Sequence, residues 1–349
     1  MSVSSLPFLH GALAAVLPKL AAWRRDFHAH PEAGWTEFRT AALIIRRLRE
    51  LGYAIRMGEA ACASDRRMGV PSSAVLAAAR ERALEHGADA ELVAGMGDGY
   101  TGFWADLDCG PGPVTAFRFD MDCNEVAECA EESHRPVREG FASRWPGLMH
   151  ACGHDGHAAV GLGLAEVLVS IRRHLRGRIR LIFQPAEEGA RGALPMSEAG
   201  AVDGVDVLFG FHIGFKAEGP GSLICGTQGF LATTKRDVLF SGVPAHAGAA
   251  PEEGKDALLA ACSAVVNLHA ISRNGKGGTR IAVGRLEGGE ARNVIPASAR
   301  LFMETRGETT ELDAYMTAES ERILRASADL WGCACEWRTV GNSAGGGSS

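Results

Sequence analysis

The chain has 349 residues, of which 46% are hydrophobic and 22% charged, and its formal net charge is −6 at pH 7. This is the composition of an ordinary soluble globular protein long enough for two domains, and the mild acidity argues against binding to nucleic acid or to an anionic membrane. Nine cysteines without framework spacing predict free thiols in a reducing compartment. With no evident signal peptide and no apolar run of spanning length, the cytoplasm is the expected location.

The chain up to residue 225 alternates between helical and strand patterns. Apolar residues at helical spacing predict helices over residues 8–29, 37–51, 72–86, 155–169 and about 192–200. Alternation of apolar and polar residues predicts strands over residues 53–57, 101–108, 113–120, 178–183 and 207–212. Strands interleaved with helices indicate an α/β sheet with helices on its faces, and residues 58–98 read as an insertion into it.

After residue 225 the pattern changes. Strands are predicted over residues 235–241, 279–287, 297–305 and 333–340, and helices over residues 255–270 and 309–330. The resulting order β-α-β-β-α-β is that of a ferredoxin-like unit. Glycine-rich polar turns bound this unit, so we predict two domains, residues 1–225 and residues 226–340. The glycine- and serine-rich residues 341–349 are expected to form a flexible tail.

The stretch from His150 to His157, HACGHDGH, contains three histidines, a cysteine and an aspartate within eight residues. A single glycine separates Cys152 from His154, so the backbone can fold and bring the sulfur and the imidazole together. Asp155 is a candidate N-cap for the apolar helix that follows. Thiolate and imidazole are ligands for zinc or a similar divalent ion. The alternative is a polar loop with one structural cysteine.

The three predicted strands over residues 113–120, 178–183 and 207–212 each end in or just before charged or ligating side chains. These side chains are Asp120, Asp122, Glu187, Glu188 and His212. Open α/β sheets place their sites at the carboxyl ends of the strands, so we expect these groups to meet Cys152 and His154 at one sheet edge. This recurrence predicts a site more strongly than any single residue does.

The adjacent carboxylates of Glu187 and Glu188 can divide two tasks between them. Neighbouring side chains in a turn point in different directions, so one can bind a metal while the other acts as general base, its pKa raised by the nearby like charge. The alternative is a solvated helix N-terminus, where paired glutamates are common. Asp120 and Asp122 could bind the metal or orient a ligand imidazole, and we favour the second role. His212 could be a ligand or a core histidine, and we favour the ligand.

These motifs resemble those of the M20 metallopeptidase and amidohydrolase family. The resemblance rests on HACGHDGH at 150–157, QPAEEG at 184–189, the strand of His212, RRDFHAHPE at 24–32, DMD at 120–122, GVPAHAGAAP at 242–251 and RNVIP at 292–296. The closest branch is that of aminoacylases, hippurate-type carboxypeptidases and indole-acetyl-amino-acid hydrolases. Two segments, 66–71 and 133–143, narrow the resemblance to the A-type subunits that hydrolyse p-aminobenzoyl-glutamate.

The resemblance implies a catalytic domain of the zinc-peptidase type, with a mixed sheet and an inserted ferredoxin-like lid. It implies a dinuclear manganese or zinc site whose ligands are Cys152, His154, Glu188 and His212. Glu187 would be the general base and Asp122 an orienting acid. The lid would form a homodimer, or a heterodimer with a paralogous chain, and would deliver His246 to the active site of the partner. Asn293 and Arg306 would bind the substrate, because a guanidinium suits bidentate capture of an α-carboxylate.

The expected activity is hydrolysis of p-aminobenzoyl-glutamate to p-aminobenzoate and glutamate. A broader N-acyl-amino-acid amidohydrolase or carboxypeptidase is the alternative within the same class. Members of the family continue past the lid into further strands and a last metal-ligand histidine, whereas the final histidine here is His269. We therefore expect the returning part of the catalytic domain to be absent from this chain. An inactive metal-binding partner subunit is the alternative from a different class.

Overall fold

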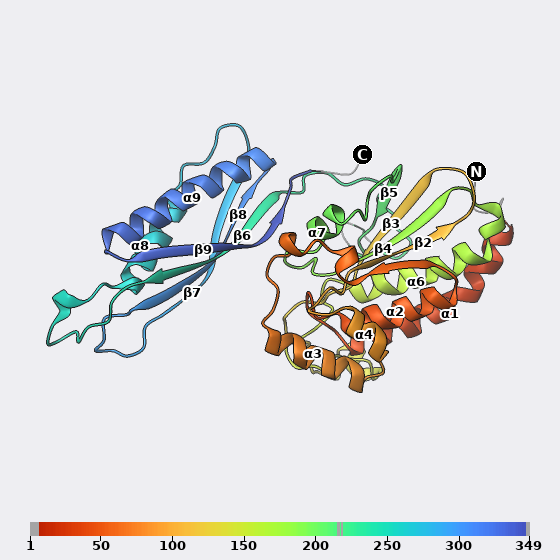
Figure 1. Ribbon diagram of the computed structural model, residues 1–349, viewed down its shortest axis with the longest axis horizontal. Helices are drawn as coiled ribbons and strands as arrows, with labels where there is room; N and C mark the ends of the chain where they lie inside the picture. Colours follow the sequence, from red (N-terminus) through yellow and green to blue (C-terminus); the bar gives the residue numbers. More distant parts are fainter. Residues whose placement is uncertain (1–6, 215–216, 218, 347–349) are drawn as a thin grey trace. The chain divides into compact units, whose positions relative to one another are not determined.

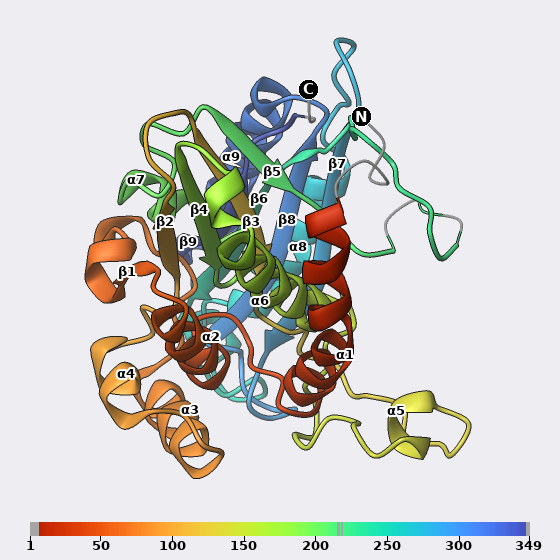
Figure 2. The same ribbon diagram turned by 90° about the vertical axis from the view of Figure 1, so that its right-hand side faces the viewer.

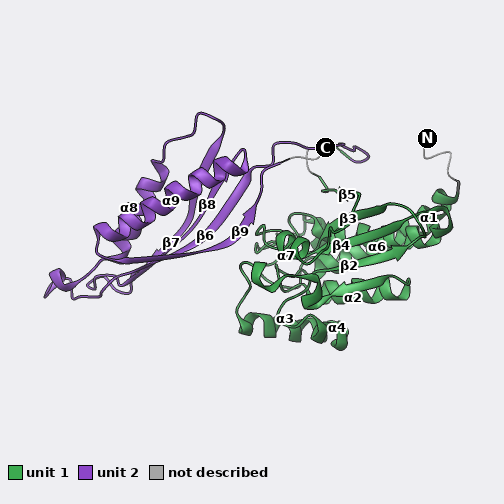
Figure 3. Cartoon of the chain, turned by 45° about the horizontal axis from the view of Figure 1, so that its top comes forward, with its two compact units in different colours: residues 1–219 green, residues 220–349 purple. Residues whose placement is uncertain are grey.

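The computed structural model describes residues 7–214, 217 and 219–346. The chain divides into two compact units, residues 1–219 (unit 1) and residues 220–349 (unit 2), coloured separately in Figure 3. Residues 220–225, which we assigned to the first domain, therefore belong to unit 2. All five strands that were expected to carry or support the site lie in unit 1.

Unit 1 is built on a five-stranded mixed sheet in the order β1-β2-β4-β3-β5 (Figure 1). The strands are β1 (Ala54–Met57), β2 (Phe103–Asp108), β3 (Val114–Asp120), β4 (Arg178–Gln184) and β5 (Val207–Gly210). β3 runs parallel to β4 and β5, whereas β2 is antiparallel to β1 and β4. The predicted α/β class with a mixed sheet is thus confirmed. Because β3, β4 and β5 are parallel, their carboxyl ends meet at one edge of the sheet.

Helices cover both faces of this sheet. Figure 2 shows α1 (Pro7–Ala29), α2 (Phe38–Glu50) and α6 (His154–Ser170) on one face. Phe103, Leu181 and Phe183 point to these helices and form the main core with residues of α2 and α6. Trp104 and Ile182, their neighbours along the strands, point to the other face and pack with Met196 of α7 (Ala193–Glu198). This alternation is the period-two pattern from which the strands were predicted.

The insertion predicted at residues 58–98 contains two α-helices. The expected helix is α3 (Ser73–Glu85), while α4 (Ala90–Gly95) was not predicted. The α4 helix is only six residues long and is capped by Asp89, whose carboxylate accepts hydrogen bonds from two backbone N–H groups. Such a short segment carries too little periodicity to indicate a helix. A four-residue helix, α5 (Arg135–Arg138), follows later in the chain.

Unit 2 has the ferredoxin-like order that the sequence predicted. Its elements are β6 (Ala232–Ser241), α8 (Ala257–His269), β7 (Thr279–Gly288), β8 (Ser298–Gly307), α9 (Thr310–Leu330) and β9 (Ala334–Ser343). The four strands form an antiparallel sheet in the order β7-β8-β6-β9, and α8 and α9 share one hydrophobic core with it. The prediction of a flexible tail from residue 341 was wrong in part, because residues 341–343 pair with β6 as the end of β9. Residues 347–349 of that tail lie outside the described residues.

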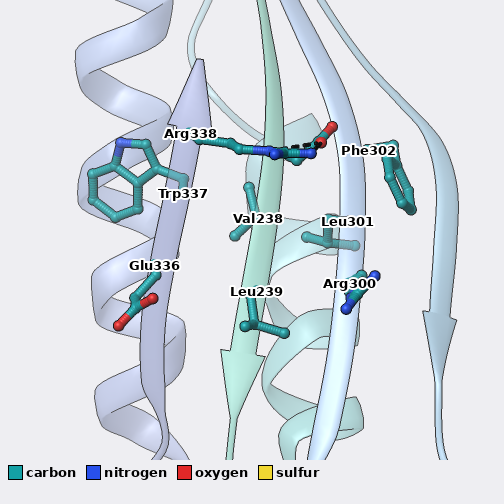
Figure 4. Close-up of a pocket in the computed structure, with 9 residues that line it drawn as sticks. Val238, Leu239, Arg300, Leu301, Phe302, Glu336, Trp337 and Arg338 are labelled. Atoms are coloured by element: carbon teal, nitrogen blue, oxygen red, sulfur yellow. Dashed lines mark hydrogen bonds and ion pairs between the residues drawn. The ribbon is translucent and has the colours of Figure 1, made fainter. Parts of the chain in front are cut away.

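A cavity of about 390 Å³ lies on the sheet of unit 2, lined by residues of β6, β8 and β9 (Figure 4). Two of its charged side chains pair with each other, Arg338 with Asp237 at 2.8 Å. The lining contains no histidine or cysteine. The cavity therefore has none of the ligating side chains that the motifs predict, and these belong to unit 1.

Candidate metal centre

The turn before α6 brings Cys152 and His154 together. Gly153 adopts a left-handed backbone with φ of +85° and serves as the N-cap, and the helix begins at His154. Only glycine takes this conformation without strain, which explains the residue between the two ligand candidates. The prediction that Asp155 caps α6 was wrong. Asp155 lies in the first turn, and its carboxylate is bound by His28 Nδ1 at 2.7 Å and Arg24 Nε at 2.9 Å.

Three predicted ligands converge on one point of unit 1. Cys152 Sγ lies 3.3 Å from His212 Nε2, although 60 residues separate them in the chain. Together with His154 they form a group whose potential ligand atoms all lie within 4.8 Å of one another. His212 follows the end of β5, and α6 packs against β3, so the parallel strands bring the three together. Sulfur and two imidazoles at this spacing match the donor set of a zinc-like ion.

His154 is oriented for metal binding by its surroundings. Its Nδ1 donates to the backbone carbonyl of Asp122 at 2.8 Å, so the lone pair of the neutral ring lies on Nε2. Nε2 is buried and has no hydrogen-bond partner among the described residues. It faces the carboxylate oxygens of Asp120 at 3.7 Å, Glu188 at 3.8 Å and Glu187 at 3.9 Å. A buried nitrogen of this kind, surrounded by carboxylates, is suited to bind a metal cation.

The turn that follows β4 holds the two glutamates. The carboxylate of Asp122 accepts the backbone N–H of Glu187 at 2.9 Å and that of Glu188 at 3.0 Å. Ala186, the residue before them, has a left-handed φ of +48°, and its N–H donates to the carboxylate of Glu37 at 2.8 Å. Sequence reasoning gave Asp122 an orienting role but missed Glu37. No local pattern could have indicated Glu37, because its partner lies far along the chain.

The electrostatics of Glu187 suit proton transfer. Burial raises the pKa of its carboxyl, and the charges of Asp122 and Asp120 raise it further against the opposing charge of Arg118. A group that accepts a proton from water at neutral pH must have its pKa raised in this direction. The same turn thus presents Glu187, with a raised pKa, next to Glu188, which faces His154 of the ligand cluster.

In the protein without a metal ion, the ligand side chains hold their protons firmly. Burial and the charge of Glu188 raise the pKa of the Cys152 thiol to about 12. Burial alone would lower the pKa of His154, but hydrogen bonding to Asp122 and the charge of Asp120 raise it to about 9. Nearby negative charge contributes to both shifts. A divalent cation would reverse them and displace these protons.

A second group of possible ligands is already engaged within the protein. Asp120, His154 and His157 are close enough to hold an ion. However, His157 Nδ1 donates to Asp120 at 2.5 Å, and its Nε2 accepts the backbone N–H of Ile213 at 2.9 Å. His157 therefore positions the residue after His212 rather than offering a lone pair. The arrangement supports an orienting role for Asp120.

The remaining predicted residues lie in unit 2. His246 and Val294 form an isolated β-bridge, and the N–H of Ala247 donates to the carbonyl of Asn293 at 3.0 Å. The exposed His246 accepts the N–H groups of Gly248 and Ala249 at Nδ1, both at 3.1 Å. The neutral ring consequently carries its hydrogen on Nε2, which makes Nε2 a hydrogen-bond donor.

Arg306 lies on β8, and its guanidinium pairs with Glu304 on the same strand at 2.6 Å. Its side chain is 43% exposed. Any carboxylate that binds Arg306 must share the guanidinium with Glu304. This pairing was not visible in the sequence-based interpretation.

Comparisons with known proteins identify the family of the chain. The model of peptidase family M20/M25/M40 matches residues 116–336. An indole-3-acetyl-aspartic acid hydrolase from Enterobacter agglomerans is 47% identical over 337 residues, which are 96% of this chain and 77% of that protein. The A-type subunit of p-aminobenzoyl-glutamate hydrolase from Escherichia coli K12 is 48% identical over 328 residues, 94% of this chain and 75% of that protein.

Among solved structures, an aminobenzoyl-glutamate utilization protein from Klebsiella pneumoniae superposes with a TM-score of 0.85 at 41% identity. The superposition covers 98% of this chain and 80% of that protein. The family match includes most of β3, all of β4 and β5, and the turns that carry the ligand cluster and both glutamates. The chain therefore belongs to peptidase family M20/M25/M40, as its motifs predicted.

Proposed function

We propose that the chain is a metal-dependent hydrolase that cleaves the amide bond of p-aminobenzoyl-glutamate, releasing p-aminobenzoate and glutamate. The observation that carries this proposal is the convergence of Cys152, His154 and His212 next to the Glu187–Glu188 turn. Two relatives of nearly equal identity are named as hydrolases of an aromatic acyl group joined to an acidic amino acid. Both names describe the same bond, an amide between an acyl carbon and an amino-acid nitrogen.

Cys152, His154, Glu188 and His212 would hold the two divalent ions, manganese or zinc. When bound, such ions polarise an amide carbonyl and lower the pKa of water to about 7. Glu187, whose pKa is raised by burial, would accept the proton of the attacking water. It would then pass that proton to the nitrogen of the leaving amine. Asp122 accepts the backbone N–H groups of both glutamates and so fixes the positions of the base and the ligand relative to each other.

Unit 2 would serve as a lid that forms a dimer. His246 Nε2, a donor in the neutral ring, would stabilise the oxyanion in the active site of a partner chain. Asn293 and Arg306 would bind the substrate, with Arg306 shared between Glu304 and a carboxylate. The Escherichia coli relative is named as one subunit of its enzyme, which supports a paralogous partner as well as a second copy.

A cytoplasmic location is part of the same proposal. The nine cysteines, all within the described residues, are free thiols, as in proteins of a reducing compartment. None of the described helices combines the length and the apolar composition needed to cross a membrane.

The test is to load the purified chain with Mn²⁺ or Zn²⁺ and to measure release of p-aminobenzoate from p-aminobenzoyl-glutamate. Glu187→Gln is the matched control, because it removes the base and leaves the predicted ligands in place. We expect turnover by the metal-loaded chain and nearly none by the variant. Equal turnover by both would contradict the assignment. Rates on benzoyl-glutamate and benzoyl-alanine that match those on p-aminobenzoyl-glutamate would favour the broader N-acyl-amino-acid hydrolase.

A further inference from the structure

A cavity of about 780 Å³ in unit 1 borders the ligand cluster. It lies between α1, the start of α6 and the segment around α5, and Cys152 lines it. Cys152 is also a member of the cluster with His154 and His212. A molecule in this cavity would therefore lie directly beside the proposed metal site.

The walls of the cavity are basic. Three arginines and three histidines line it, and no aspartate or glutamate of the described residues does so. The six are Arg24, Arg25, His28, His134, Arg135 and His150. The carboxylates that pair with them, Asp155, Glu128 and Glu139, are not among the lining residues. The pairs are thus oriented with their basic groups toward the cavity, which favours an anionic ligand.

His150 gives the second, independent sign of a ligand. Its side chain is 3% exposed, and neither ring nitrogen has a hydrogen-bond partner among the described residues. Buried polar groups are nearly always hydrogen-bonded, so an unpaired imidazole that lines a cavity indicates a missing partner. Either tautomer of the ring presents one N–H donor. Gly153 and Gly156 at the N-terminus of the 17-residue helix α6 also line the cavity, where the helix dipole favours negative charge.

The remaining lining is apolar. Phe141, Met149 and Ile213 contribute to it, and Arg24 and Arg25 lie over the ring of Phe141 at 5.3 and 4.8 Å. Aliphatic and aromatic walls with basic groups suit a carboxylate carried on a short hydrocarbon chain. An inorganic anion would leave this apolar surface without a partner.

We propose that this cavity binds the side-chain carboxylate of the acidic amino acid in the substrate, and so selects acyl-glutamate over acyl-amides of neutral amino acids. This inference rests on the proposed function and extends it to a specificity pocket in unit 1. The amino acids named in the two relatives, aspartate and glutamate, both carry such a carboxylate. Their acyl groups differ, whereas the negative charge on the amino acid is common to both.

The test compares binding of benzoyl-glutamate with binding of benzoyl-glutamine, which has nearly the same shape and no side-chain charge. Affinities are measured by calorimetry on the metal-loaded full chain carrying Glu187→Gln, so that hydrolysis does not interfere. We expect benzoyl-glutamate to bind roughly tenfold more tightly, as one charge-assisted hydrogen bond typically provides. Equal affinities for the two compounds would overturn the proposal.

Arginine variants locate the preference. Arg25→Gln and Arg135→Gln remove basic groups that line the cavity, and each should reduce the preference several-fold. Arg138→Gln is the matched control, because Arg138 lies on the same short helix as Arg135 and does not line the cavity. His150→Leu should remove most of the preference while the bound metal, counted separately, is retained. A preference unchanged in all three cavity variants, or lost equally in Arg138→Gln, would place recognition elsewhere.

Two further measurements separate this inference from the proposed function. Inorganic phosphate should compete with benzoyl-glutamate only weakly, and tighter binding of phosphate than of benzoyl-glutamate would make the cavity a phosphate site and overturn the proposal. Turnover of p-aminobenzoyl-glutamate by the wild-type chain is assayed in parallel. If turnover is absent while the binding preference persists, the proposed function fails and the pocket stands. If turnover is present without the preference, the pocket fails alone.

Discussion

The buried carboxylate of Glu37 accepts the backbone N–H of Ala186, 149 residues further along the chain, at 2.8 Å. Its other oxygen accepts the hydroxyl of Thr101 at 2.6 Å. Glu37 is fully buried at the start of α2. The hydrogen bond ties that helix to the turn that presents Glu187 and Glu188, so this interior carboxylate supports the position of both candidate active-site glutamates.

The stability of the metal-free protein is expected to depend on pH through Glu37. Burial and the nearby charge of Asp122 raise the pKa of Glu37 from 4.5 to about 8. Between these values the folded state holds a proton that the unfolded state has released. The free energy of unfolding should therefore fall as the pH rises through this window, by at most about 1.4 kcal/mol per pH unit from this group.

Glu37→Gln should remove this pH dependence, because glutamine stays neutral and still offers an acceptor to the N–H of Ala186. The measurement is chemical denaturation of wild type and variant at pH 5, 6, 7 and 8. Glu81→Gln, at an exposed position of α3, is the control and should keep the wild-type slope. Parallel curves for wild type and Glu37→Gln would show that Glu37 is ionised throughout this range.

The two neighbouring glutamates are expected to respond differently to the same substitution. Glu187→Gln should retain the metal and lose roughly 10²- to 10⁴-fold in kcat, the usual contribution of a general base. Glu188→Gln should instead lose bound metal, because it removes a proposed ligand oxygen near His154. We would measure kcat on each preparation and determine its metal content by elemental mass spectrometry. If both variants retain metal equally, the roles of base and ligand are misassigned.

Metal affinity should rise with pH. Burial raises the pKa of Cys152 to about 12, and hydrogen bonding to Asp122 with nearby negative charge raises that of His154 to about 9, so both are protonated in the metal-free protein at pH 7. Each proton that the ion displaces contributes about a factor of ten per pH unit to the apparent affinity. Competition with a chromophoric chelator between pH 6 and 8 measures this slope.

Cys152→Ser isolates the contribution of the thiol to that slope. A serine hydroxyl does not release its proton as a thiol does, so the variant should bind zinc more weakly and with a slope smaller by one proton.

Removal of metal from the wild type by a chelator should abolish turnover, and Mn²⁺ or Zn²⁺ should restore it. A zinc affinity independent of pH, or full activity after chelation, would argue against these ligands.

His246→Ala and Glu187→Gln are each expected to be nearly inactive, but mixing the two variants should restore activity. If His246 acts in the partner chain, one of the two sites in every mixed dimer has both residues intact. Activity is measured before and after subunit exchange, with exchange verified by differently tagged chains. The double variant His246→Ala with Glu187→Gln, mixed with either single variant, is the control and should restore nothing. No recovery after verified exchange would place His246 in the same chain as its site or give it a structural role.

Several elements were predictable because their signals are local. The strands β3 and β4 follow directly from alternation of apolar residues, and the order β6-α8-β7-β8-α9-β9 from changes in periodicity. The short α4 and the pairing of residues 341–343 were missed, since a six-residue helix and a glycine-containing strand end have weak patterns. The cap of α6 was misassigned, because Gly153 occupies the N-cap position and Asp155 lies within the first turn of the helix.

The amino-acid sequence by itself determined the family, the α/β class and the set of candidate ligands, because the spacing within HACGHDGH and the residues that end each strand are properties of short segments. Only the tertiary structure decided which groups support that set. Glu37 at the turn of Glu187, and His157 at the backbone after His212, act through hydrogen bonds between distant segments. The basic cavity around His150 also depends on distant segments. Its basic side chains line the cavity, whereas their carboxylate partners do not. Such partnerships depend on how strands and helices pack, and no local pattern in the chain encodes them.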